Sequence, residues 1–152
     1  MIEFEIADPN YERRVRDSFD HQPMMKTMGV SLVVVSPGRV EFAMEFADHL
    51  TQQNGFLHAG ALSTGLDSAC GFSSYTLMAP DASILTIENK VNLLRPALEG
   101  PFRITGQVIK PGRTIIVSEG HAWDGDGKLV ATMSATNMTI ADRPDVGITW
   151  KE

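Results

Sequence analysis

The sequence predicts one α+β domain in which an antiparallel sheet wraps around a single long helix. Three observations support this fold class. A hairpin of two strand-like runs comes early, one long helical segment follows it, and four further strand-like runs follow in meander order. The chain has 152 residues, a length typical of one domain. We expect a helical extension over residues 1–28, the core over residues 29–140 and a polar tail over residues 141–152.

Two short helices and a hairpin are expected first. Asp8-Pro9 is typical of an N-cap followed by a proline in the first turn, and it predicts a helix that ends near Phe19. A second helical piece is expected from Pro23 to Met28. The hairpin consists of Val30–Val35 and Arg39–Phe46, joined by Ser-Pro-Gly. Its second strand alternates, with a predicted buried face of Val40, Phe42, Met44 and Phe46.

A polar loop, Ala47–Leu57, leads into the long helix. The helix is expected roughly from Ala59 to Met78, just before Pro80, and such a helix spans about 30 Å. The later strands are expected at Ile84–Leu94, Phe102–Lys110, Thr114–Trp123 and Leu129–Ile140, with Asp124–Lys128 as the last turn.

The long helix has two different faces. One stripe is mostly apolar and should pack on the sheet, whereas the second is made mostly of small residues, which favours close approach by a second subunit or a ligand. A solvated face is the alternative, but such faces usually carry Lys and Glu, and this one has neither. The apolar stripe is Leu62, Leu66, Ala69, Cys70, Ser73 and Leu77; the small-residue stripe is Gly60, Thr64, Asp67, Gly71, Ser74 and Met78.

The composition argues against several classes of protein. No apolar run approaches the ~20 residues of a membrane span, and the acidic start is unlike a signal peptide. The net charge of −6, without a block of Lys or Arg, argues against nucleic acid as the main partner. Since Cys70 is the single cysteine, no intrachain disulfide can form, and we expect a cytoplasmic protein with no membrane partner.

Metal and phosphate-loop motifs are missing. The turn Asp-Gly-Asp-Gly-Lys has Lys128 at a ligand position and no closing glutamate, so it is not a calcium loop. No Gly-rich phosphate loop or nucleophile elbow is present. We therefore expect no metal and no bound cofactor. The four histidines lack metal-site spacing and cysteine partners: His21, His49, His58 and His121.

The start of the long helix is the best candidate site. Its first amides, at Ala59 and Gly60, have no intrahelical acceptor and could polarise a carbonyl oxygen, while Asp67 could act as general base or nucleophile. The alternative is that Asp67 is an ordinary solvated or salt-bridged carboxylate. Gly60 and Asp67 lie about 10 Å apart along the helix axis, so one chain cannot easily bring both to the same carbon. Such a site should lie across a dimer of antiparallel helices.

Two segments resemble the hotdog-fold acyl-CoA thioesterases, specifically the phenylacetate-pathway (PaaI-like) branch. These are "NGFLHAGALSTGLDSACG" and "TIENKVNLLRPALEG" with the strands that follow it, and the resemblance covers roughly Met28 to Ile140. Its marks are a His-Gly-Gly-type loop with a carboxylate nine residues later, "LRPA", a "GR" turn and "DGKLVA". It implies a sheet wrapped around one helix, acyl-CoA as substrate, and a homodimer, with a dimer of dimers expected.

The resemblance also implies roles for individual residues. Asp67 would be the catalytic carboxylate, supplied by the partner subunit, and the amides of Ala59 and Gly60 would hold the thioester oxygen. Ala59 departs from the usual Gly-Gly and could tighten the groove. An amide side chain near the water would be Gln52, with Asn54 as a competing candidate. His58 is expected mainly to fix the loop, and Thr86 matches a water-positioning Ser or Thr.

Coenzyme A would arrive as part of the substrate, so cations must meet its phosphates. The candidates are Arg95, Lys110, Gly112 and Arg113, although "KPGR" is equally a plain hairpin turn and Arg95 could hold a loop carboxylate. The acyl pocket is expected to use Phe56, Leu57, Phe72 and Met78.

Two other functions are weighed. A hotdog enoyl-CoA hydratase or dehydratase could pair His58 or His49 with Asp67, but the His-Phe-Pro-Gly-like loop of dehydratases is absent. A non-catalytic acyl-CoA-binding protein would not need the carboxylate. For the thioesterase, we favour Asp67 as general base, and a covalent anhydride at Asp67 remains the alternative.

Overall fold

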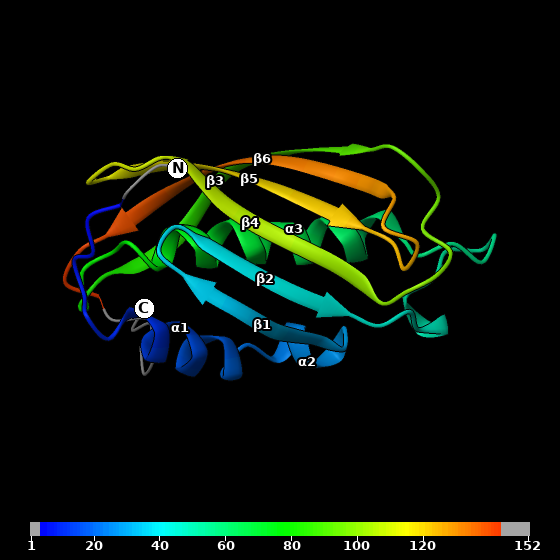
Figure 1. Ribbon diagram of the computed structural model, residues 1–152, viewed down its shortest axis with the longest axis horizontal. Coiled ribbons are helices and arrows are strands. Elements are labelled where there is room, and N and C mark those ends of the chain that lie inside the picture. Colours follow the sequence, from blue (N-terminus) through cyan, green and yellow to red (C-terminus); the bar gives the residue numbers. More distant parts are fainter. Residues whose placement is uncertain (1–3, 144–152) are drawn as a thin grey trace, which may run out of the picture.

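The computed structural model describes residues 4–143 as one antiparallel sheet curved around a long helix (Figure 1). The six strands lie in the order β1-β2-β4-β5-β6-β3, and all neighbours pair antiparallel. The predicted α+β fold class is confirmed. Residues 144–152, most of the expected tail, and residues 1–3 lie outside the described part. The elements are α1 (Tyr11–Asp20), α2 (Pro23–Thr27), β1 (Val30–Ser36), β2 (Arg39–Met44), the short 3₁₀ helix η1 (Asp48–Leu50), α3 (Ala59–Tyr75), β3 (Ser83–Leu93), β4 (Phe102–Lys110), β5 (Ile115–Trp123) and β6 (Leu129–Ile140).

Helix α3 packs its apolar stripe on the concave face of the sheet. Leu66, Ala69 and Cys70 are completely buried, as the helical spacing predicts. The helix approaches β4 so closely that a side chain in place of Gly106 would overlap the backbone of Ala69. The glycine is therefore required by close approach. This packing fixes which side of α3 remains for a ligand or a second subunit.

The small-residue stripe of α3 is only partly available. Gly60 is exposed and Asp67 is half-buried, but Ser74 and Met78 are buried inside the same chain. The prediction of one continuous open stripe is therefore wrong at its C-terminal end. The reason is that Ser74 bonds to β6 through Asn137, so that turn of the helix belongs to the core.

The N-terminal segment is fastened to the C-terminal half of α3. Arg14 lies 2.8 Å from the carboxylate of Asp8 and donates to the carbonyls of Tyr75 and Met78. The rings of Phe19 and Phe72 add an aromatic contact, with centroids 5.8 Å apart. Contrary to the prediction, Asp8 is not the N-cap of α1. Asn10 occupies that position without a side-chain cap, because the Asp8 carboxylate is engaged by Arg14 and by the Asn10 amide.

The two edges of the sheet differ in cover. Strand β1 runs beside α1 and α2, whereas β3, at the opposite edge, pairs with β6 and has no element on its outer side among residues 4–143 (Figure 1). Strand β3 is long for an edge strand and leaves Leu85, Ile87 and Leu93 about half exposed. A long apolar edge of this kind is a template for pairing with another chain.

Candidate active site

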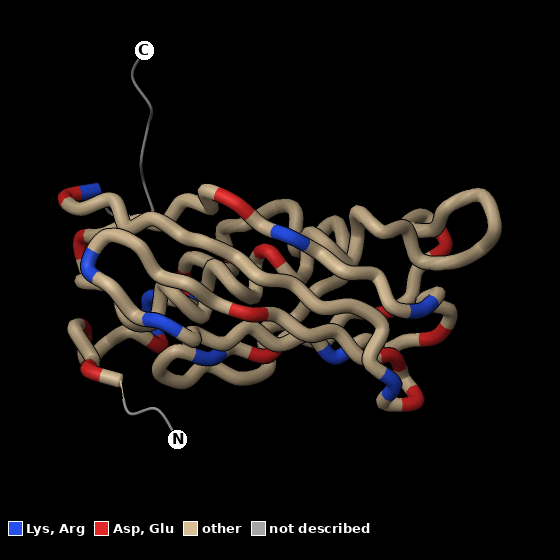
Figure 2. Tube along the Cα trace, turned by 90° about the horizontal axis from the view of Figure 1, so that it is seen from above, with Lys and Arg blue, Asp and Glu red and all other residues tan. Residues whose placement is uncertain are grey.

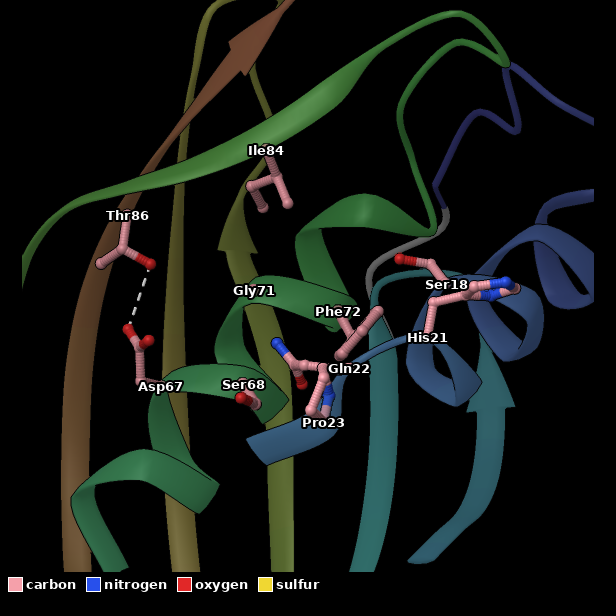
Figure 3. A pocket seen from close by; sticks show the side chains of 10 residues that line it. All are labelled: Ser18, His21, Gln22, Pro23, Asp67, Ser68, Gly71, Phe72, Ile84 and Thr86. Atoms are coloured by element: carbon pink, nitrogen blue, oxygen red, sulfur yellow. Dashed lines mark hydrogen bonds between the residues drawn. The ribbon is translucent and has the colours of Figure 1, made fainter. Parts of the chain in front are cut away.

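The carboxylate of Asp67 points from α3 toward β3 and is held there through one oxygen. Thr86 Oγ and Asn89 Nδ2 each donate to Oδ1 of Asp67, both at 3.1 Å (Figure 3 shows the bond to Thr86). No hydrogen bond from residues 4–143 reaches Oδ2. The side chain is therefore oriented by the same chain, and one oxygen remains for chemistry. Asp67 forms no salt bridge with residues 4–143, and its two donors support the interpretation of Asp67 as a site residue.

A β-bulge explains why Thr86 and Asn89 both reach Asp67. Residues three apart on a regular strand point to opposite faces. The register of β3 on β6 shifts between Thr86 and Glu88, so the extra residue, Ile87, returns Asn89 to the face that carries Thr86. Bulges often re-aim side chains next to active sites. Here the bulge supplies the second donor to Asp67.

A buried polar network lies behind Thr86. Its hydroxyl is 3.4 Å from Oδ1 of Asn137, which is completely buried. Asn137 donates to the hydroxyls of Ser74 and Ser118, both at 3.1 Å, and both serines in turn donate to the carbonyl of Cys70. The Thr86 hydroxyl has a single proton, so it donates to Oδ1 of either Asp67 or Asn137 at any one time. The network therefore places this hydroxyl between the two oxygens. It connects the position of the Asp67 carboxylate to the packing of α3 on β5 and β6.

Beside Asp67 lies a cavity of about 340 Å³ between α3, β3 and the turn that joins α1 to α2. Phe72 and Ile84 provide apolar walls. Gly71 also lines the cavity and leaves space there, because nothing lies within 4 Å of a β-carbon placed on it. Figure 3 shows Gln22 on the side opposite α3. The cavity is lined by Ser18, His21, Gln22, Pro23, Asp67, Ser68, Gly71, Phe72, Ile84 and Thr86.

Of the residues expected in an acyl pocket, the structure brings only one to this cavity. Phe72 lines it, but Leu57 is buried in the core and Phe56 belongs to the loop before α3. Met78 lines a different hollow at the C-terminal end of α3. Phe56, Leu57 and Met78 therefore do not line this cavity within one chain, and their place in an acyl pocket stays a prediction.

The first turn of α3 is capped by a histidine. His58 is the N-cap, and its Nδ1 accepts a hydrogen bond of 2.9 Å from the amide of Gly60. The expectation that the amides of both Ala59 and Gly60 are free is therefore wrong for Gly60. The ring of His58 can act in this way because it stands two residues before the amide, as the side chain of a usual N-cap does. The structural role expected for His58, fixing the loop, is what the geometry shows.

The loop before α3 is closed on itself. The side chain of Gln52 accepts from the amide of Asn54, and the backbone amide of Gln52 donates to the carbonyl of Phe56 at 2.8 Å. Gln52 is half-buried and Asn54 is exposed. Within one chain, both lie before the N-terminus of α3 and away from the cavity beside Asp67.

The candidate phosphate contacts lie at two ends of the molecule. Arg95 lies at the end of the molecule where α3 begins, because the nearby carbonyl of Ala97 accepts a hydrogen bond from the amide of Leu57. The guanidinium of Arg95 donates to the carbonyl of Leu129. Gly112 and Arg113 line a hollow beside the C-terminal end of α3. Figure 2 shows positive and negative residues interspersed along the chain, so any attraction for an anionic ligand must be local.

Within residues 4–143, no group of three or more His, Cys, Asp or Glu side chains is arranged to hold a metal ion. No helix in that range has the length and apolar character needed to cross a membrane.

The sequence profile of the thioesterase superfamily matches residues 54–131, just over half of the chain and the segment that includes the cap of α3, Asp67, Thr86 and Asn89. The chain belongs to the thioesterase superfamily. The expected class of enzyme, a thioester hydrolase, is confirmed.

Relatives of this thioesterase include two named proteins. One, from Saccharolobus solfataricus, is provisionally named an esterase and is 32% identical over 108 residues, which cover 71% of this chain and 76% of its own. The other is the 1,4-dihydroxy-2-naphthoyl-CoA hydrolase of Listeria monocytogenes, 24% identical over 113 residues, with 74% of this chain and 92% of that protein covered.

Solved structures agree with the fold. A thioesterase family protein from Silicibacter pomeroyi is 49% identical, with a TM-score of 0.82 and coverage of 86% of this chain and 98% of that one. The PaaI protein of the phenylacetic acid degradation operon of E. coli also has a TM-score of 0.82, at 16% identity, covering 91% and 99% of the two chains. The predicted resemblance to hotdog-fold thioesterases, PaaI among them, is confirmed.

Sequence reasoning missed three polar residues of the thioesterase site. Asn89 stands in β3, where its direction depends on a bulge that no local pattern reveals. Asn137 and Gln22 reach the site from segments far away in sequence. The one available signal was an asparagine in the middle of a strand, a position where this residue type is depleted.

The thiol of Cys70 takes no part in the chemistry. It is completely buried, and its burial raises its pKa to about 12, with smaller contributions from the charges of Asp67 and Glu119. A neutral, buried thiol is not a nucleophile. Cys70 fills space between α3 and the sheet, where a side chain in place of Gly120 would meet its sulfur.

Proposed function

We propose that this thioester hydrolase cleaves acyl-CoA, with Asp67 as general base. The observation that carries the proposal is the carboxylate of Asp67, oriented through Oδ1 by Thr86 and Asn89 at the wall of a cavity that can hold an acyl group. An oriented carboxylate with one free oxygen can take a proton from a water molecule.

The reaction follows from this arrangement. Oδ2 of Asp67 accepts a proton as the water oxygen bonds to the thioester carbon, and the carbonyl oxygen becomes an oxyanion. When the oxyanion collapses, the carbon–sulfur bond breaks and the leaving thiolate takes the proton from Asp67. The products are the free acid and the CoA thiol, and Asp67 returns to its ionised form. Attack by Asp67 itself, through an anhydride, is the alternative that ¹⁸O labelling of the carboxylate would reveal.

The oxyanion needs donors, and we infer that a second subunit supplies them. The amide of Ala59 begins α3, about 12 Å along the helix axis from Asp67 of the same chain. Two chains paired through the free edge of β3, with their α3 helices antiparallel, would bring Ala59 of one toward Asp67 of the other. The exposed apolar side chains of β3 support such a homodimer. In this arrangement, the Gly60 amide contributes only if His58 releases it, and Gln52 or Asn54 would reach the partner's site.

The same pairing would gather the candidate phosphate contacts. Arg95 lies where α3 begins, and the turn from Lys110 to Arg113 lies where α3 ends. Antiparallel helices bring the beginning of one next to the end of the other. We therefore keep Arg95 and the Lys110–Arg113 turn, with Gly112 giving access to the backbone, as the contacts for coenzyme A. The dimer of dimers and the cytoplasmic location remain predictions.

A hydratase is the competing function. His58 caps α3, and Nε2 of His49 lies 3.3 Å from the carbonyl of Thr27, so neither histidine shares the cavity with Asp67. His21 does line that cavity, although its Nδ1 is bonded to the carbonyl of Asp17. Within one chain, therefore, neither of the expected histidines stands beside Asp67. A second subunit that brings Ala59 toward Asp67 would bring the neighbouring His58 with it, so the test includes hydration as the competing reaction.

The test is a substrate screen of the pure protein. Acyl-CoAs from acetyl to long-chain, together with benzoyl-CoA, are assayed for free thiol, and crotonyl-CoA is assayed in parallel for hydration. We expect thiol release from a subset of acyl-CoAs and no hydration. Hydration without thiol release would establish the competing function, and tight binding of acyl-CoA without either reaction would show a non-catalytic binding protein.

A further inference from the structure

The wall of the cavity opposite α3 comes from the turn between α1 and α2. Ser18, His21, Gln22 and Pro23 line it, and they belong to the helical extension ahead of the core. These residues precede β1, the first strand of the sheet. It stands on the far side of the cavity from the helix that carries Asp67 (Figure 3).

This wall is held in a fixed position. The amide of Gln22 donates to the carbonyl of Phe19, and the Phe19 ring packs on Phe72, which itself lines the cavity. One helical turn earlier, Arg14 is buried against Asp8 and the end of α3. The turn is therefore a rigid boundary, and it limits how far an acyl group can extend from Asp67.

Gln22 is the polar group of this wall that lacks a partner. It precedes α2 but makes no capping hydrogen bond. Its Oε1 is enclosed by protein atoms and has no hydrogen-bond partner among the described residues. Figure 3 shows its carboxamide directed into the space between α3 and β3. An enclosed amide oxygen without a donor costs stability, so a hydroxyl of a bound ligand that donates to Oε1 would relieve a defect of the free protein.

The size and the lining of the cavity limit the ligand. Its volume of about 340 Å³ exceeds the ~150 Å³ of a protein cavity that holds benzene, so it has room for one ring or a chain of similar bulk. Phe72 and Ile84 suit the apolar body of such a group, and Oε1 of Gln22 suits a hydroxyl at its far end.

We propose that Gln22 determines acyl specificity, by accepting at its Oε1 a hydrogen bond from a hydroxyl at the distal end of a one-ring or medium-length acyl group. The preferred substrates are then acyl-CoAs with a hydroxyl remote from the thioester. This inference rests on the proposed acyl-CoA hydrolysis and adds to it a substrate class and the residue that selects it.

The experiment compares matched substrates in wild type and Gln22→Leu. Hexanoyl-CoA is paired with 6-hydroxyhexanoyl-CoA, and benzoyl-CoA with 4-hydroxybenzoyl-CoA, with kcat and KM measured from thiol release. The control is Gln107→Leu, on an exposed position of β4 outside the cavity. Gln22→Met, an unbranched apolar replacement, is included in case leucine disturbs the turn, and thermal unfolding checks both variants.

We expect wild type to prefer the hydroxylated member of at least one pair by about tenfold in kcat/KM, the worth of one good hydrogen bond. Gln22→Leu and Gln22→Met should reduce that ratio to about one, mainly through KM, and Gln107→Leu should keep it. Thiol release with an unchanged ratio in both folded Gln22 variants would overturn this inference alone. No thiol release from any acyl-CoA by wild type would instead overturn the proposed function and this inference with it.

Discussion

Replacing Thr86 by valine removes one of the two donors that hold Asp67 and leaves the shape of the side chain almost unchanged. The lost bond, 3.1 Å from the Thr86 hydroxyl to Oδ1, is made to a charged acceptor. Such bonds contribute about 1.5–3 kcal/mol, and Asp67 is half-buried and keeps Asn89 as a donor, so we take the lower end. A loss of about 1.4 kcal/mol in orienting the base corresponds to a roughly tenfold lower kcat. KM should change little, because Asp67 acts on the water and not on substrate binding.

The assay is thiol release from the best acyl-CoA, together with urea unfolding. Unfolding should show a loss of about 1 kcal/mol, because the completely buried Asn137 loses the hydroxyl near its Oδ1. Thr136→Val is the matched control, since Thr136 neighbours Asn137 on β6 and therefore points to the opposite face of the sheet. A wild-type kcat in Thr86→Val, or an equal loss in Thr136→Val, would refute the assignment of Thr86 as a positioning residue.

Three further predictions concern the clamp, the cavity and the buried thiol. Arg14→Ala should lower the free energy of unfolding by about 3–5 kcal/mol, because it leaves the buried carboxylate of Asp8 unpaired. The ion pair of Arg13 is exposed, so the control Arg13→Ala should cost less than about 1 kcal/mol, and equal losses in urea unfolding would contradict this. Gly71→Leu should fill the cavity and reduce kcat/KM on the order of 100-fold without loss of stability, whereas Gly106→Ala should lower the melting temperature. Full activity of Gly71→Leu would show that the acyl group lies elsewhere. Burial raises the pKa of Cys70 to about 12 from 9.0, so only the unfolded thiol ionises between these pH values, and the free energy of unfolding should fall by about 1.4 kcal/mol per pH unit above pH 9. The same dependence of stability on pH in Cys70→Ala would contradict this.

The order of elements could be predicted because each segment carries its own periodicity. The alternation in β2 placed Val40, Phe42 and Met44 in the core, and all three are completely buried. The ends were harder to predict. Helix α3 ends at Tyr75, three residues early, because the amides of Leu77 and Met78 bond three residues back and tighten the last turn. Residue type does not distinguish that turn from a continuing helix.

The site was predicted where it depends on the chain near α3 and missed where it depends on distant contacts. Asp67 stood out as a single carboxylate among small residues, and its setting in the structure supports the choice. The hydrogen bond from Asn89 to Asp67 depends on a bulge in β3, and the position of Gln22 in the cavity wall depends on the packing of α1 on α3. The cap at His58 was missed because histidine is not among the usual N-cap residues.

The role of Asp67 is the central claim, and Asp67→Asn tests it most directly. The amide keeps the size of the side chain and an oxygen that can still accept from Thr86 or Asn89, but it cannot take a proton from water. The measurement is single-turnover thiol release from the best acyl-CoA, with Asp81→Asn, an exposed aspartate beyond the end of α3, as control. We predict a rate lower by about 10²–10⁴-fold for Asp67→Asn, with unchanged folding and oligomeric state, and a wild-type rate for Asp81→Asn. Single-turnover hydrolysis at the wild-type rate in Asp67→Asn would contradict the account.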